Sequence, residues 1–106
     1  MTEPSLHYEP RRRVYRDEEG RAHRENGPAV LWNYGQEEHY LHGILHRIGG
    51  PAVHNLGGYR AYYEHGQLHR LDGPAIVHPY GSNEWWVRGI RLPDNPSPED
   101  ILLALL

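Results

Sequence analysis

The sequence predicts an all-β protein: an elongated, twisted antiparallel sheet of about three to four 23-residue β-hairpin repeats, followed by a short C-terminal α-helix. Two observations lead to this prediction. The phrase His-Arg-x-x-Gly-Pro-Ala occurs at 23–29, 46–52 and 69–75, each copy 23 residues after the last. Glycines and aromatic residues between the copies keep the same spacing. A fixed period of about 20 to 50 residues is typical of repeat proteins, whose units bury their apolar faces against one another.

The segments between the glycines are predicted to be short strands. Proline and glycine recur too often between residues 23 and 92 for a helix. The intervening stretches, such as AVLWN, RAYYE and NEWWV, are rich in the β-branched and aromatic residues that favour strands. We therefore predict one β-hairpin per unit. Its turn is placed at the dipeptide that tight turns prefer because it tolerates positive φ: Asn26-Gly27, Gly49-Gly50 and Asp72-Gly73.

The repeated phrase is interpreted as scaffolding. Its proline fixes φ where the next strand begins, a position at which a missing N–H costs little. Its alanine is small enough for an aromatic side chain of a neighbouring unit to lie over it. The predicted structural residues of the phrase are Gly27, Pro28, Gly50, Pro51, Gly73 and Pro74.

Two columns of rings follow the period, and because they are adjacent in the chain they point to opposite faces of the sheet. The more regular column, Tyr40, Tyr63 and Trp86, is expected to form the structural spine. The second column is then expected to be partly exposed; the reverse assignment stays open. Tyrosine, tryptophan and arginine anchor protein interfaces. We therefore predict a partner-binding set, drawn from the second column and the C-terminal helix: His39, Tyr62, Trp85, Arg60, Leu102 and Leu105.

The chain is divided into four segments. Residues 1–12 are predicted to be an irregular arm, 13–92 the repeat domain, 93–97 a proline-rich linker and 98–106 a short apolar helix. Ser97 is the expected N-cap, with Pro98 at the first helical position. The following ILLALL is apolar on all sides, so it must be covered. We expect it either to cap the last hairpin over Trp85 or Trp86, or to pack against a second copy of the chain or against a partner.

The stretch YYEHGQLHRLDGPAIVHPYGSNEWWVRGIR at 62–91 resembles the membrane occupation and recognition nexus (MORN) repeat, which is also 23 residues long. The resemblance covers about residues 13–92. The chain departs from the usual form in its Gly-Pro-Ala phrase and in lacking a glycine between the aromatic residues. The resemblance implies an elongated sheet used as a binding platform, without catalytic residues. This variant of the repeat is one that we associate with bacterial and viral reading frames.

Composition and spacing argue against several chemistries. The chain has no lysine and no cysteine, and its three serines stand outside any repeated His/Asp arrangement, so no catalytic residue is assigned. The histidines at 23, 46 and 69 would lie about 9.5 Å apart, one hairpin per step, which is too far for one metal ion. Closer pairs at 42/46 and 65/69 supply only two ligands each. We therefore predict no metal and no cofactor.

The expected function is nonenzymatic protein binding through an aromatic sheet surface, by a modulator or inhibitor of a host protein that a phage or mobile element encodes. Two alternatives stay open. One is a membrane-surface adaptor that uses the repeats and the C-terminal helix. The other is single-stranded nucleic-acid binding through the arginines at 24, 47 and 70, although a net charge of −3 and arginine–ring stacking within the sheet weigh against it. No apolar run approaches the ~20 residues of a membrane span, so a cytoplasmic location is expected.

Overall fold

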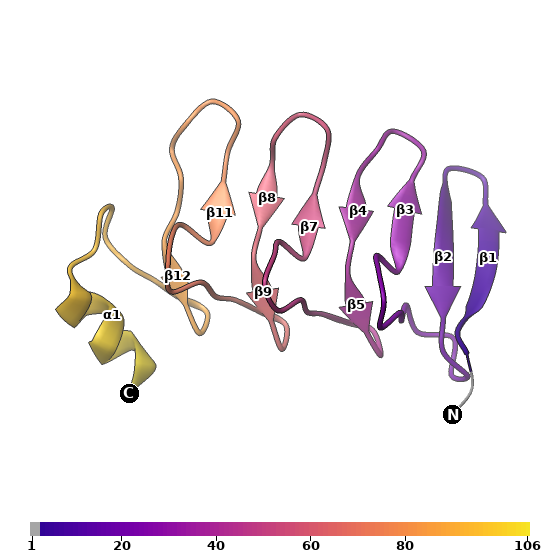
Figure 1. Cartoon of the computed structure of the whole chain (residues 1–106), viewed down its shortest axis with the longest axis horizontal. Coiled ribbons are helices and arrows are strands. Elements are labelled where there is room, and N and C mark those ends of the chain that lie inside the picture. The colour runs from indigo at the N-terminus through magenta and orange to yellow at the C-terminus, as the bar shows by residue number, and fades with distance from the viewer. Residues whose placement is uncertain (1–2) are drawn as a thin grey trace.

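A seven-stranded antiparallel sheet runs the length of the molecule in the computed structural model, which describes residues 3–106 (Figure 1). The body measures 44 × 32 × 16 Å. All neighbouring strands are antiparallel, and the predicted all-β fold with a short C-terminal helix is confirmed. In spatial order the sheet contains β1 (Ser5–Glu9), β2 (Arg12–Arg16), β3 (Val30–Trp32), β4 (Glu37–Glu38), β7 (Val53–His54), β8 (Arg60–Ala61) and β11 (Ile76–Val77).

Each unit also carries a second, smaller hairpin, so the prediction of one hairpin per unit was too simple. The smaller hairpins are β5 (Tyr40–Leu41) with β6 (Ile44–Leu45), β9 (Tyr63–Glu64) with β10 (Gln67–Leu68), and β12 (Trp86–Val87) with β13 (Ile90–Arg91). Their two-residue turns are His42-Gly43, His65-Gly66 and Arg88-Gly89. Both residues of each turn have positive φ, as a type I′ turn requires.

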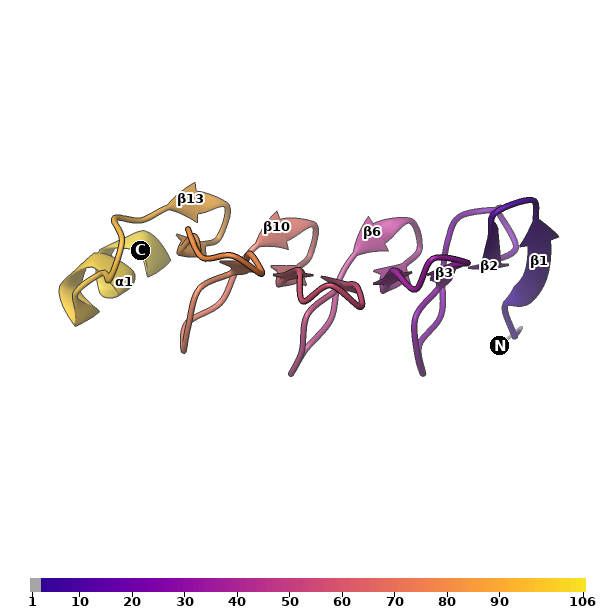
Figure 2. The same cartoon turned by 90° about the horizontal axis from the view of Figure 1, so that it is seen from above.

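The dipeptides that we predicted as turns lie elsewhere, in three bends that each lead into a sheet strand: the first follows the turn after β2, and the other two follow the small hairpins β5/β6 and β9/β10. We name these the first bend (residues 24–28), the second bend (47–51) and the third bend (70–74). None of the predicted dipeptides has positive φ at both positions, which explains why they do not close hairpins. Figure 2 shows the three bends projecting from one face of the sheet, with the small hairpins toward the other.

The histidine of each phrase joins its unit to the next. Its Nδ1 accepts a hydrogen bond from the backbone N–H of the first turn residue in the following unit. The bonds run from His42 to His23 (2.9 Å), from His65 to His46 (2.9 Å) and from Arg88 to His69 (3.0 Å). The next position at this spacing after His69 is residue 92. No further repeat unit follows it to form such a bond, and it is occupied by a buried leucine.

The arginine of each phrase closes its own bend. Its Nη1 donates to the proline carbonyl four residues later, at 3.3, 3.0 and 3.1 Å in the three bends. A Cβ atom on Gly50 would lie 2.9 Å from Cζ of Arg47, and one on Gly73 would lie 2.8 Å from Cζ of Arg70. Glycine is therefore required because the guanidinium occupies the space of a side chain.

The same arginine stacks on a ring of the preceding strand. Cζ of Arg24 lies 4.0 Å from the ring centre of Tyr15, and Cζ of Arg70 lies 4.1 Å from that of Tyr62. The expected stacking of arginines on rings within the sheet is confirmed in these two units. A guanidinium over an aromatic face gains cation–π attraction, so ring, arginine and bend form one layer. We call the contact of each arginine with its own bend the arginine clamp; in these two units the ring is part of it.

The alanine of each phrase lies beside a ring-bearing residue. Backbone N–H groups of Tyr15, His39 and Tyr62 donate to the alanine carbonyls at 2.8, 2.7 and 2.7 Å. The three alanines, 29, 52 and 75, are fully buried.

The rings of the expected aromatic spine are not deeply buried. Tyr40, Tyr63 and Trp86 are only half-buried, as are the rings of the second column. A one-layer sheet shelters small side chains between its neighbours but cannot cover large rings on both faces. The buried positions are Val14, Ala29, Val30, Ala52, Ala61, Ala75, Val87 and Leu92, with His23 beside them.

Both ends of the sheet are closed by additional elements. The segment 1–12, predicted to be irregular, contains β1, which pairs with β2 and whose Glu9 bonds Arg12 and Arg16 at 2.9 and 2.6 Å. At the other end, α1 (Pro98–Leu105) lies beside β12, and Nη1 of Arg88 donates to the carbonyl of Leu105 at 2.8 Å. Of the two roles expected for this helix, capping the last hairpin is the one observed. Within residues 3–106, no helix has the length and apolar character needed to cross a membrane.

Gly50→Ala tests the arginine clamp. We expect it to lower the free energy of unfolding by about 1 kcal/mol, because the methyl group displaces the Arg47 guanidinium from its bond to Pro51. In an Arg47→Ala background the same change should be neutral or stabilising by about 0.5 kcal/mol, since alanine restricts the unfolded chain. Urea unfolding of the four proteins gives the coupling energy. Equal effects of Gly50→Ala in both backgrounds would contradict the clamp.

Candidate interaction surface between the first two bends

A groove of about 650 Å³ lies between the first and second bends. The two bends are rigid walls, because an arginine clamp holds each of them. The ends of β4, β7 and β8 contribute the polar side chains. The lining residues are Gly27, Pro28, Glu37, His39, Arg47, Pro51, His54, Asn55, Leu56, Gly58 and Arg60.

One row of polar side chains crosses this groove. Glu37, His54 and Arg60 lie directly opposite one another on neighbouring strands. His54 Nε2 is 3.5 Å from Glu37 Oε1. Arg60 is exposed and makes no ion pair with any residue in the part of the chain that the structure describes. Because Arg47 already bonds the second bend, Arg60 is the arginine of this groove whose donors remain available to a partner.

An apolar side chain stands at the end of the same groove. Leu56 is 87% exposed although its side chain lies across the neighbouring loop, where a Cβ on Gly35 would come within 2.6 Å of it. The adjacent Tyr34 is 60% exposed. An uncovered leucine that shares a groove with an available arginine is the kind of apolar and charged pairing found in protein interfaces.

His39 is the ring at the base of the groove. Burial lowers the pKa of His39 to about 4, and the positive charge of Arg47 adds to the shift. The imidazole therefore stays neutral at physiological pH. His39 is equivalent to Tyr62, 23 residues later, whose ring stacks against the Arg70 guanidinium.

The residues predicted to bind a partner are spread over several places. His39 and Arg60 share the groove. Tyr62 lies in the next unit beneath Arg70, and Trp85 lies beyond it at the end of the row. Leu102 and Leu105 are on α1, with Leu102 exposed and Leu105 half-buried. Leu56 was missed, because nothing in the sequence indicates that a loop leucine lies over a glycine of the preceding loop.

Two members of the other aromatic column, Tyr40 and Trp86, donate hydrogen bonds to carboxylates. Glu38 accepts hydrogen bonds from Trp32 Nε1 at 2.9 Å and from the Tyr40 hydroxyl at 3.2 Å. Glu84, its equivalent two units later, accepts from Trp86 Nε1 at 3.0 Å. Burial, followed by the charge of Glu38, raises the pKa of Tyr40 to about 12. These side chains satisfy one another, which gives them a structural role.

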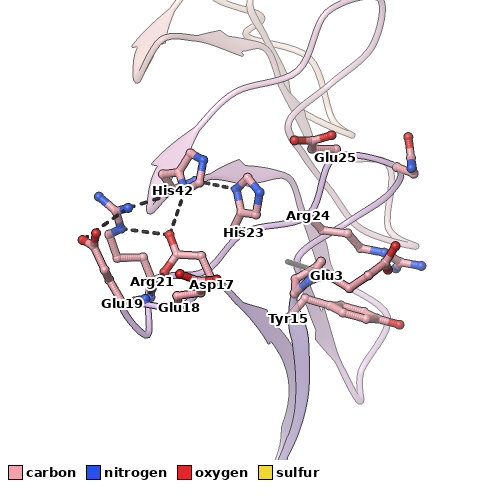
Figure 3. Close-up of a pocket in the computed structure, with 12 residues that line it drawn as sticks. Glu3, Tyr15, Asp17, Glu18, Glu19, Arg21, His23, Arg24, Glu25 and His42 are labelled. Carbon is pink, nitrogen blue, oxygen red and sulfur yellow. Dashed lines mark hydrogen bonds and ion pairs between the residues drawn. The ribbon is translucent and has the colours of Figure 1, made fainter. Parts of the chain in front are cut away.

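A second, acidic cleft of about 730 Å³ lies at the N-terminal end of the sheet (Figure 3). Hydrogen bonds from His42 and from the Arg21 region hold the pKa of Asp17 well below its usual range. His42 Nδ1 is 2.8 Å from Asp17 Oδ2, and the rings of His42 and His23 stack at 3.8 Å. The side chains of Asp17, Arg21 and His42 therefore satisfy one another's hydrogen bonds. The cleft is lined by Glu3, Pro4, Tyr15, Asp17, Glu18, Glu19, Arg21, His23, Arg24, Glu25, Asn26 and His42.

Comparison with known proteins gives no match: no family model, no curated protein and no solved structure corresponds to this chain. The resemblance to MORN repeats therefore stays a prediction. Among residues 3–106, no group of three or more histidine, aspartate or glutamate side chains is arranged to hold a metal ion.

The lowered pKa of His39 predicts a pH dependence of stability. The unfolded chain takes up a proton on this imidazole near pH 6.5, whereas the folded protein does so only near pH 4. Lowering the pH from 6.5 to 4 therefore favours the unfolded state. His39→Tyr, which copies Tyr62, should keep a ring in the groove that takes up no proton between pH 6.5 and 4, and should therefore reduce the loss of stability across this range.

Urea unfolding of both proteins between pH 7 and 4.5 makes the comparison. The pKa values of Glu9 and Glu84 are also lowered, but these carboxylates act only below their ordinary value of 4.5. The same slope of stability against pH in the wild type and in His39→Tyr would contradict the assignment.

Proposed function

We propose that this protein is a nonenzymatic protein-binding module, and that its partner docks in the groove between the first two bends. The observation that carries the proposal is the pairing of Arg60, exposed and free of ion pairs within residues 3–106, with the uncovered Leu56 in a groove with rigid walls. A site whose walls are already formed loses less conformational entropy on binding than a mobile surface, and arginine and apolar anchors supply much of the binding energy of protein interfaces. Modulation of a host protein, the role that the repeat variant suggests, is the form of binding that we propose.

A nucleic-acid partner receives less support. The phrase arginines would have to supply the basic stripe, yet each already donates to a proline carbonyl in its own bend. Phosphate contacts dominate nucleic-acid affinity, and a chain with net charge −3 has few arginines left for them. No feature comparable to the pairing of Arg60 with Leu56 supports a membrane-surface role. Liposome binding in the experiment below would favour that role instead.

The test is capture of a partner from the lysate of the native host by wild type and by Leu56→Ser/Arg60→Glu. Tyr80→Ser is the matched control, because Tyr80 is fully exposed on the equivalent loop of the next unit. We expect the wild type and the control to retain one protein that the double variant loses, with an affinity at least about tenfold weaker once it is purified.

All three proteins should share the wild-type circular dichroism, since the changed side chains are exposed. Equal binding by the double variant would place the interface elsewhere. Binding of liposomes or of single-stranded nucleic acid, with no protein captured, would favour the alternative partners over the one proposed.

A further inference from the structure

The C-terminal helix has an unpaired apolar stripe, although it contains the most apolar segment of the chain. None of the residues of α1 is buried. Ile101, Ala104 and Leu105, which share one side, are half-buried. The opposite side carries three leucines at spacings of one, three and four residues, which place them on one face. They are Leu102, Leu103 and Leu106, with exposures of 59, 60 and 92%.

The helix that carries this stripe is stabilised by a capping box at its N-terminus and is joined to the sheet at its C-terminus. At the N-terminus, the Ser97 side chain accepts from the Asp100 N–H at 3.1 Å, and Asp100 accepts from the Ser97 N–H at 2.9 Å. At the C-terminus, Arg88 donates to Leu105. An eight-residue helix is marginal in isolation, so these contacts and the packing beside β12 hold it in one orientation. The leucines are therefore presented by a positioned helix.

The two ends of α1 carry opposite charges, so two copies of the helix can pair with opposite charges in contact. Glu99 lies in its first turn, and Arg88 lies at its C-terminal end. Two such helices packed antiparallel place Glu99 of each copy near Arg88 of the other, and they also align the helix dipoles favourably. A parallel pair would place the acidic ends together. A surface that is complementary to itself is what a two-fold dimer requires.

We propose that a second copy of this chain covers the stripe, through antiparallel packing of the two α1 helices about a two-fold axis. Figure 1 shows α1 at the end of the sheet opposite the N-terminus, beyond β11 and β12. The groove between the first two bends is therefore left open, so the dimer presents two grooves and is independent of the proposed function.

The dimer is expected to be weak. The helix is about 12 Å long at the usual rise per residue. Three leucines bury much less than the roughly 800 Å² per partner of a standard interface. We therefore expect a concentration-dependent equilibrium between monomer and dimer, with half-dimerisation at tens to hundreds of micromolar as an order of magnitude.

Sedimentation equilibrium of the full chain between about 10 µM and about 1 mM tests this range. The wild type should rise from 12.3 kDa toward twice that mass. Leu102→Ser/Leu106→Ser should stay monomeric throughout, and Tyr80→Ser should behave as the wild type. Circular dichroism checks that the serine variant keeps its fold. A wild type that is monomeric at about 1 mM, or a serine variant that dimerises equally, would overturn the proposal.

Charge exchange tests the antiparallel arrangement. Glu99→Arg and Arg88→Glu should each weaken self-association, because like charges then meet in both symmetric contacts. An equimolar mixture should form a heterodimer about as strong as the wild-type dimer, since both contacts regain opposite charges. Failure of the mixture to associate, while the wild type dimerises, would overturn the antiparallel packing.

Discussion

The arginine clamp is the interaction on which the rest of this structure depends. In each phrase a guanidinium donates to the proline carbonyl of its own bend and fills the space left by the glycine. In two units it also lies over a tyrosine of the preceding strand. A single-layer sheet has no second layer to bury its rings, so planar cations perform that task here. The clamp also fixes the bends, and therefore the walls of the groove.

The thinness of the sheet makes the stability of the protein a sum of contacts between neighbours. The buried side chains are small, and no large hydrophobic core unites the units. Each phrase histidine accepts a bond from the next unit, and in two units the arginine also stacks on a preceding tyrosine ring. The groove stands on two adjacent units, so its shape depends on the coupling of those units as much as on the side chains that line it.

Much of the fold could be predicted from the spacing of the repeat, because a fixed period and alternating β-forming residues leave few other architectures. The two-hairpin unit could not, since His42-Gly43 is a less typical turn sequence than Asn26-Gly27 and only the backbone shows which of them has positive φ. His39 and Arg60 were selected as ring and cation and do share the groove. Leu56 and the groove itself depend on how far each bend projects, which no local pattern encodes.

Native-state hydrogen exchange of the wild type, read by NMR, tests the coupling of the units most directly. The amides of His42, His65 and Arg88 lie in exposed turns, yet each donates to a histidine of the preceding unit. If the phrase joins neighbouring units, these three amides exchange as slowly as the sheet amides, through openings that both units share. Exchange as fast as that of other exposed turn amides would show that the turns open singly, and it would contradict the role given to the phrase.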